Sequence, residues 1–259
     1  MWPLSFISED DFFNHVKTTI HQYGDKLESF DLAKFNKNMI DPIKLIFDKL
    51  VYFYSWDEII NNEILRQRDK SNNNDIGYFH QRIFQYINGC EVPASGWDII
   101  FSTKNGINIY KDEIVSRVFV EIKNKHNTMN SASSRNTYTK MQSQILDDDD
   151  CACFLVEVIA KQSQNIKWIC SIDGHSKKHS RIRRVSIDKF YSLVTGQVDA
   201  FYQMCMVLPD TIRKAVAEIY VNTFIKDSVV NELEAMAQSK GISKELCLYL
   251  LGFRGYDGF

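Results

Sequence analysis

Apolar residues in the first part of the chain, from residue 9 to about residue 87, recur at helical spacing. One such face consists of Phe12, Phe13, Val16 and Ile20. Pro42, directly after an aspartate, predicts a helix that begins with proline at its first position. The polar run KSNNND, residues 70–75, predicts a loop that separates two helices, the second at about residues 76–87. We therefore expect this part of the chain to be helical.

The pattern changes to short β-type runs between about residues 96 and 172. The expected strands are WDIIFST, GINIY, RVFVEIK, CFLVEVIA and IKWICSI. A helix at about residues 133–146 interrupts them, with SASS as its N-cap and LDDDD at its end. After residue 186 helical spacing returns, and helices are expected near residues 187–193, 211–225, 228–239 and 243–250. This order predicts an α/β fold in which helices flank a central mixed β-sheet, with helical extensions at both ends.

Composition limits the classes of function. The 259 residues include 44% hydrophobic residues, enough for a substantial core, and the formal net charge is -2. The chain is thus neither a basic nucleic-acid coat nor an acidic tail protein, and any polyanion site must be a local patch. The six cysteines form no CxxC pair, and we expect small buried hydrophobes rather than disulfides or metal ligands. We find no signal peptide and no apolar segment of about 18 residues, so we expect a cytoplasmic protein and no membrane contact.

Three charged residues give the sharpest chemical signal. Glu121 and Lys123 are two positions apart on an expected strand, so their side chains project to the same face. Asp98 lies on an earlier strand that can pair with this one. Two carboxylates on neighbouring strands supply the hard oxygen ligands that Mg²⁺ requires, and a lysine beside them can act on a phosphate and a water. The alternative is an ordinary surface salt bridge, since E-x-K alone is common.

The four consecutive aspartates, residues 147–150, are a weaker candidate for a metal site. Consecutive carboxylates diverge, whereas a divalent ion needs oxygens that converge from separate parts of the chain. We therefore expect a solvated helix end at this point.

The order of helix, Asp98 strand, EIK strand, helix and strand resembles the core of the PD-(D/E)XK nucleases, with Trp97 in place of the motif's proline. The segments NNNDIGYFHQRIF, GWDIIF and KNKHNTMNSAS are further similar to type II restriction endonucleases that cut GGNCC-type sites. The likeness is strong over about residues 61–145 and loose elsewhere. The short catalytic motif is degenerate, and the KNKHNTMNS extension is much more specific.

The resemblance implies a role for each residue of the motif. Asp98, Glu121 and the backbone carbonyl of Ile122 would hold Mg²⁺, and Lys123 would assist the attacking water. Hydrolysis would leave a 5′-phosphate and a 3′-hydroxyl. Many members place one more acid on the helix before the first strand, for which Glu63 is the candidate, although a solvated or capping role is the alternative. The helix nearest that strand offers His80 and Gln81 as further polar residues.

Two segments are candidates for contacts with double-stranded DNA. The first follows the EIK strand and contains side chains of the types that bond base edges, with a solvated, capped loop as the alternative. Its residues are Asn124, Lys125, His126, Asn127, Thr128, Asn130, Ser131, Arg135 and Asn136. The second is a basic run that suits phosphate contacts, or else forms a solvated face. Its residues are Lys177, Lys178, Arg181, Arg183 and Arg184, with His175 and His179 as further donors.

We expect three consecutive regions that together form one compact domain: residues 1–90, a catalytic core at residues 91–195, and residues 196–259. A palindromic site predicts a homodimer, with the C-terminal helices as plausible dimerisation elements. A cognate DNA methyltransferase would protect host DNA without binding the enzyme. The alternatives are a DNA-repair or junction-resolving nuclease of the same fold, a DNA-binding protein without catalysis, and a helical interaction protein.

Overall fold

The computed structural model describes residues 2–24, 29–219 and 227–252, which form two compact units. The sheet unit comprises residues 1–20 and 76–218, and the helical unit comprises residues 21–75 and 219–259. Each unit combines segments from distant parts of the chain. The division therefore differs from the three consecutive regions that the hydrophobic pattern suggested.

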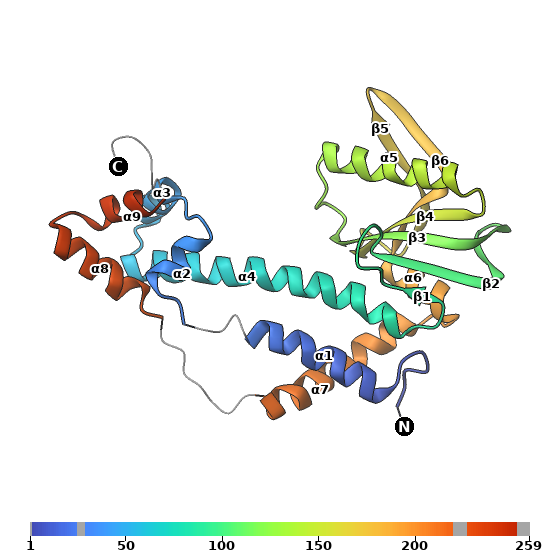
Figure 1. The fold of residues 1–259 in the computed structure, drawn as a ribbon, viewed down its shortest axis with the longest axis horizontal. Helices are drawn as coiled ribbons and strands as arrows, with labels where there is room; N and C mark the ends of the chain where they lie inside the picture. The colour runs from blue at the N-terminus through green and yellow to red at the C-terminus, as the bar shows by residue number, and fades with distance from the viewer. Residues whose placement is uncertain (1, 25–28, 220–226, 253–259) are drawn as a thin grey trace. The chain divides into compact units, whose positions relative to one another are not determined.

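A six-stranded mixed sheet forms the centre of the sheet unit, in the order β1-β2-β3-β4-β6-β5 (Figure 1). Strands β3, β4 and β6 run parallel to one another, and the remaining neighbours are antiparallel. The strands are β1 (Cys90–Glu91), β2 (Ile99–Tyr110), β3 (Glu113–Lys125), β4 (Cys151–Ile159), β5 (Asn165–Ile172) and β6 (His175–Ser186). The predicted fold class is confirmed.

Helices cover both faces of this sheet. Helix α5 (Ser131–Asp147) packs on one face, where Tyr138 and Met141 are fully buried against Phe119 of β3. Helix α6 (Ile187–Thr195) packs on the other face, over a larger core that includes Val120 and Ile122. The same core contains residues of α1 (Glu9–Gly24), the short 3₁₀ helix η1 (Ile83–Tyr86) and α7 (Ala200–Ile219). We name the two sides of the sheet the α5 face and the α6 face.

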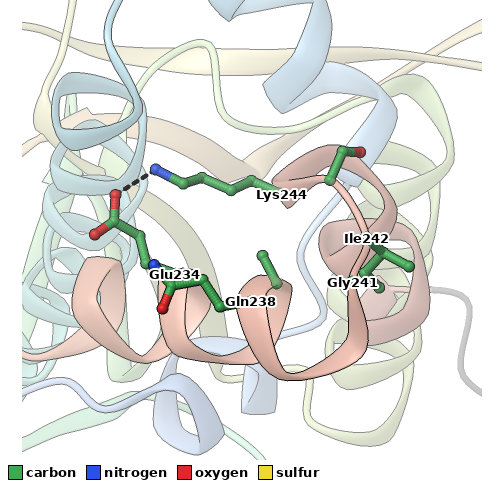
Figure 2. Close-up of a pocket in the computed structure, with 7 residues that line it drawn as sticks. Glu234, Gln238, Gly241, Ile242 and Lys244 are labelled. Atoms are coloured by element: carbon green, nitrogen blue, oxygen red, sulfur yellow. Dashed lines mark hydrogen bonds and ion pairs between the residues drawn. The ribbon is translucent and has the colours of Figure 1, made fainter.

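The helical unit is built from α2 (Leu32–Lys37), α3 (Pro42–Tyr52), α8 (Val229–Lys240), α9 (Lys244–Gly252) and most of α4 (Trp56–Arg82). Its core contains Phe35, Ile60 and Leu233, which are almost fully buried. Figure 2 shows a hollow at the turn between α8 and α9, where Glu234 and Lys244 form an ion pair. No helix among the described residues is both long and apolar enough to cross a membrane.

The predicted loop at residues 70–75 is wrong, because α4 continues through it without a break. The polar side chains satisfy local groups on the helix surface: the amide of Asn73 donates to the backbone oxygen of Asp69, four residues earlier, at 3.0 Å. A run of asparagine and serine is compatible with a helix when its side chains bond within the same helix.

The other elements follow the predicted pattern more closely. WDIIFST and GINIY form the single strand β2, with an irregularity between Ser102 and Ile107. Helix α5 begins two residues before the predicted start, with Asn130 rather than SASS as its N-cap. Helices α6, α8 and α9 occupy the predicted places, whereas α7 begins at Ala200 instead of residue 211, and residues 220–225 of that prediction lie outside the described residues. Strand β6 was not expected.

Candidate active site

Asp98 lies directly before β2, at the edge where β2 meets β3. Its backbone nitrogen donates to the oxygen of Val120 at 3.1 Å, which continues the ladder between the two strands by one residue. Its side-chain Oδ2 accepts the backbone N–H of Ile122 at 2.8 Å. Because β2 begins only at Ile99, this N–H has no strand partner, and the carboxylate takes that place. Burial raises the pKa of the Asp98 carboxyl above its usual value, although the bond from Ile122 opposes that shift.

Glu121 and Lys123 lie on the α5 face of β3, as the alternation of the strand predicts. Lys123 Nζ is 3.6 Å from Glu121 Oε2, whereas Val120 and Ile122 are buried in the core of the α6 face. Glu121 and Lys123 remain partly exposed, with 14% and 33% of their side-chain surfaces accessible. The structure therefore brings Asp98, Glu121, Ile122 and Lys123 together at the point where β2 begins beside β3.

A second lysine that the sequence interpretation did not identify also reaches Glu121. Lys140 of α5 forms an ion pair with Glu121 Oε1 and donates to the backbone oxygen of Gly96. Its Nζ lies 4.0 Å from the centre of the Trp97 ring, a cation–π contact. Trp97 is held in turn by Gln144, one helical turn after Lys140, whose Oε1 accepts its indole N–H at 3.1 Å. Both oxygens of the Glu121 carboxylate thus face an ammonium group.

The residues proposed from the helix before β2 have different positions. Gln81 donates to the backbone oxygen of Asp98 at 3.1 Å and so helps to fix the segment that carries this aspartate. His80 is partly buried, and its Nδ1 has no hydrogen-bond partner among the described residues. Glu63 is 5% exposed and pairs with Arg66 at 2.5 Å within the helical unit.

The segment predicted to read bases follows directly from β3. Its members Lys125, Asn127, Thr128, Asn130, Ser131, Arg135 and Asn136 are exposed, and Asn124 and His126 are partly buried. The backbone of His126 is fixed on both sides, because its N–H donates to Ile159 at 3.0 Å and its oxygen accepts from Arg184 at 3.2 Å. Asn130 has a structural role as the N-cap of α5, where its side chain accepts the N–H of Ser133 at 2.8 Å. Arg135 pairs with Asp173 at 3.1 Å on the surface.

The predicted basic patch lies on β6 and divides between surface and interior. Lys177 and Lys178 are exposed, and Arg181 is partly buried with its guanidinium on the backbone oxygens of Asp149 and Cys151. Arg183 does not fit the predicted DNA contact: it is 1% exposed, donates to the backbone of Asn165 at 2.7 Å and packs on the ring of Tyr110. The physical reason is the alternation of the strand, which points Arg183 into the α6 face beside Val185.

Arg184 is also held within the protein. It forms an ion pair with Glu157 of β4, whose side chain is only 2% exposed, and the same guanidinium reaches His126. Glu157 is the register neighbour of Lys123 on the parallel pair β3 and β4. This buried pair therefore links the catalytic strand to the segment predicted to read bases, and it fixes where that segment leaves the sheet.

The side chains of two of the four consecutive aspartates contact groups of β3. Asp148 pairs with Arg117 at 2.9 Å, and Asp150 accepts the N–H of Ser116 at 3.0 Å. Both contacts tie the end of α5 to the start of the parallel strands. They fit the structural interpretation of this run better than a metal site.

The residues around Asp98 fit a divalent cation that keeps much of its water. Among the described residues no cluster of three or more His, Cys, Asp or Glu side chains could hold a metal ion. Mg²⁺, however, is commonly held by only one or two carboxylates, with waters and substrate phosphate completing six oxygen ligands. Asp98 and Glu121 supply two carboxylates. The carbonyl of Ile122 points to the same edge as its N–H, which Asp98 binds.

Comparison with known proteins gives a consistent assignment. The model of the family described as Eco47II restriction endonuclease matches residues 4–217. The type II restriction enzyme Sau96I of Staphylococcus aureus is 32% identical over 214 residues, which cover 80% of this chain and 78% of the relative. The type II restriction enzyme Eco47II of Escherichia coli is 27% identical over 224 residues, covering 83% of this chain and 89% of the relative. The resemblance inferred from GWDIIF, EIK and KNKHNTMNS is confirmed. The chain therefore belongs to the Eco47II restriction endonuclease family, as a type II, site-specific deoxyribonuclease.

Proposed function

We propose that this restriction endonuclease hydrolyses both strands of duplex DNA at a short GGNCC-like palindrome, with Mg²⁺ as cofactor and Asp98, Glu121 and Lys123 as catalytic residues. The observation that carries the proposal is the junction of β2 and β3. There the Asp98 carboxylate binds the N–H of Ile122 at 2.8 Å, between two residues whose charged groups lie 3.6 Å apart. One acid directly before β2, one acid of β3 and a lysine of β3 thus lie close together.

The proposed chemistry assigns each group a task. Asp98, Glu121 and the Ile122 carbonyl would hold Mg²⁺, which when bound offsets the charge that develops on the scissile phosphate. The Lys123 ammonium orients the attacking water and favours loss of its proton. Water attacks phosphorus in line and gives up a proton to solvent, and the bond from phosphorus to the 3′ oxygen breaks. The leaving oxygen takes up a proton from solvent, which gives a 3′-hydroxyl and a 5′-phosphate.

The ion pair between Lys140 and Glu121 has a direct consequence for this chemistry. An ammonium on Glu121 Oε1 and a metal ion at the same carboxylate compete, because both are cations and repel each other at short range. Lys140 would therefore leave this oxygen when Mg²⁺ binds. The Gly96 oxygen and the Trp97 ring would keep its ammonium beside the site.

Recognition of the site would come from the exposed residues between β3 and the first turns of α5. Lysine and arginine bond guanine edges, and asparagine bonds adenine or takes part in mixed networks. Lys177 and Lys178 on the exposed part of β6 would contact phosphates and position the duplex. Cleavage of both strands of a palindrome calls for two active sites, so the working form is a homodimer. The enzyme would act in the cytoplasm, with host DNA protected by a methyltransferase that it does not bind.

A cleavage assay tests the proposal. The protein is incubated with a long unmethylated phage DNA, with and without Mg²⁺, and the fragment ends are mapped. We expect discrete fragments, only with Mg²⁺, that share a GGNCC-like junction. A smear would indicate a nonspecific or repair nuclease instead, and intact DNA would contradict both.

Two substitutions test the catalytic assignment. Asp98→Ala and Lys123→Ala should each reduce cleavage at least 1000-fold, roughly the effect of removing a group that acts in the transition state. Both variants should still bind duplex DNA in Ca²⁺, as measured by gel shift. Glu63→Ala, which removes an acid of the helical unit, should retain cleavage. If a folded Glu63→Ala variant no longer cleaved DNA, Glu63 would be part of the catalytic site.

A further inference from the structure

An exposed apolar surface of the helical unit surrounds α3. We name it the α3 face and define it by Ile43, Phe47, Leu50, Val51 and Phe53. Each of these side chains is between 49% and 91% exposed. Single exposed apolar residues are ordinary in folded proteins, but several large ones gathered along one helix mark a contact surface.

The sequence of α3 shows that this exposure is built into the helix. Ile43, Phe47 and Leu50 follow the spacing of four and three residues that places side chains on one helix face. The opposite side carries Leu45, which is 3% exposed and part of the core of the helical unit. A helix that is apolar on both sides is typical of a position covered from both sides.

Backbone strain at the end of α3 supports the same conclusion. Phe53 adopts the left-handed conformation, with φ of 58°, and its side chain is 91% exposed. Met39, just before the helix, has φ of 50° and is 86% exposed. Bulky residues rarely adopt positive φ, and such strain is concentrated at functional positions. Here it places two large apolar side chains in solvent.

We propose that the α3 face is the surface on which two copies of this chain associate. The five side chains expose on the order of 700 Å², if a whole large apolar or aromatic side chain presents about 150–250 Å², and one partner in a standard interface contributes about 800 Å². The neighbouring charges do not oppose self-association. Lys44 pairs with Asp48, and Lys49 lies over the ring of Trp56 at 5.2 Å. An identical partner is the choice that rests on the proposed function, because a palindrome has two-fold symmetry.

The interface is tested with charged substitutions on this face. Phe47→Glu and Leu50→Glu place a carboxylate in the contact without removing a buried side chain, so circular dichroism and the melting temperature should change little. Val198→Glu, at an 80% exposed residue of the sheet unit, is the matched control. Sedimentation velocity without DNA should give a dimer of 30.2 kDa chains for the wild type and the control, and a monomer for both α3 variants.

A cysteine variant gives an independent readout. Val51→Cys places a thiol on the α3 face, and mild oxidation should link two chains through it, at a rate that Leu50→Glu in the same chain reduces at least tenfold. A wild type that is monomeric, or a dimer that survives both glutamate variants without cross-linking, would overturn the proposed interface. A monomer whose melting temperature falls with Phe47→Glu would also overturn it, by showing that one chain covers its own α3 face.

The outcomes separate this proposal from the proposed function. A wild-type dimer that loses its association in the α3 variants but cuts no DNA would contradict the function alone. A monomer that cuts at GGNCC-like sites would contradict the interface alone.

Discussion

Glu121 is held between Lys123 and Lys140, and this local arrangement sets the metal affinity that we expect. Replacing Lys140 with glutamine removes the cation that occupies Oε1 while leaving a side chain of similar length. Ca²⁺ should then bind the DNA-free protein more tightly, by about three- to tenfold, on the order of 1 kcal/mol for a partly exposed pair. Isothermal titration calorimetry measures this affinity directly.

Two control variants distinguish occupancy of Glu121 from a general change of charge. Lys140→Arg keeps a cation that can bind the carboxylate, and its Ca²⁺ affinity should stay close to that of the wild type. Lys104→Gln removes the charge of an exposed lysine on β2 and should leave the affinity unchanged. If Lys140→Gln weakened Ca²⁺ binding, Lys140 would instead orient Glu121 for the metal.

At the scale of single residues, the sequence predicted side-chain positions that depend on the alternation of a strand. It did not predict contacts that depend on how distant elements pack. Glu121 and Lys123 share a face because side chains alternate along any strand. Lys140 reaches Glu121 only because α5 docks across β3, and no spacing within the chain indicates that contact. Arg183 was predicted as a surface residue because strand β6 was not expected. The alternation of side chains along that strand could therefore not be used to place it.

The sequence did contain a signal for β6. Strands β5 and β6 are joined by the two-residue turn Asp173-Gly174, and both residues have positive φ, 50° and 77°. Asp-Gly between two β-type runs is among the strongest hairpin signals, because both central positions of this turn require that conformation. The run HSKKHSRIRR was interpreted by its charge instead. Its apolar residues Ile182 and Val185 are too few to show a strand period.

The N-cap of α5 leads to a prediction about this helix. Asn130 accepts the N–H of Ser133 at 2.8 Å and so satisfies one of the free donors at the helix start. Asn130→Ala should destabilise the protein by about 1 kcal/mol, whereas Asn130→Asp or Asn130→Ser should recover most of the loss. Thermal unfolding measures the change. Equal stability of the alanine and serine variants would show that the cap contributes nothing.

The packing of α1 against α4 gives a prediction about pH. Burial, reinforced by His15, lowers the pKa of His80 from 6.5 to about 4, and burial also lowers the pKa of His15. The unfolded chain therefore takes up a proton near pH 6.5 that the folded chain refuses until about pH 4. The free energy of unfolding is therefore unaffected by this histidine above pH 6.5. It decreases as the pH falls from 6.5 to about 4, by on the order of 3 kcal/mol in total.

His80→Phe should remove this part of the pH dependence. Chemical denaturation between pH 7 and pH 4, compared for the wild type and the variant, measures it as the difference between the two curves. The free energy of unfolding of the variant should decrease less between pH 7 and pH 4 than that of the wild type. Replacing His15 as well should make this decrease smaller still. Parallel curves for all three proteins would show that these histidines are not protected from protonation in the folded state.

At the scale of the whole molecule, the two units show what a linear interpretation of the chain misses. Hydrophobic periodicity identified the helices of both ends, but it does not indicate which helices pack together. Most of the first helix belongs to the sheet unit, whereas α2, α3 and the helices α8 and α9 belong to the helical unit. Helix α4 contributes to both units because it continues through residues 70–75, where a loop was predicted. The polar composition of these residues therefore does not mark the end of a helix.

The proposed dimer predicts how the two strands of one site are cut. Each chain supplies a complete set of Asp98, Glu121 and Lys123, so each copy should cleave one strand of a palindrome without help from its partner's side chains. A heterodimer of one wild-type chain and one chain with both Asp98→Ala and Lys123→Ala, isolated through different affinity tags, should therefore nick supercoiled plasmid that contains a single site. The open circle should accumulate at about half the rate at which the wild-type dimer makes its first cut, because one of two equivalent sites remains.

Linear product should form only slowly, since the second cut requires the same dimer to dissociate and bind again in the opposite orientation. If the heterodimer instead made linear DNA at the wild-type rate, one active site would serve both strands, and the symmetry argument for two copies would fail together with the reason for placing a second chain on α3.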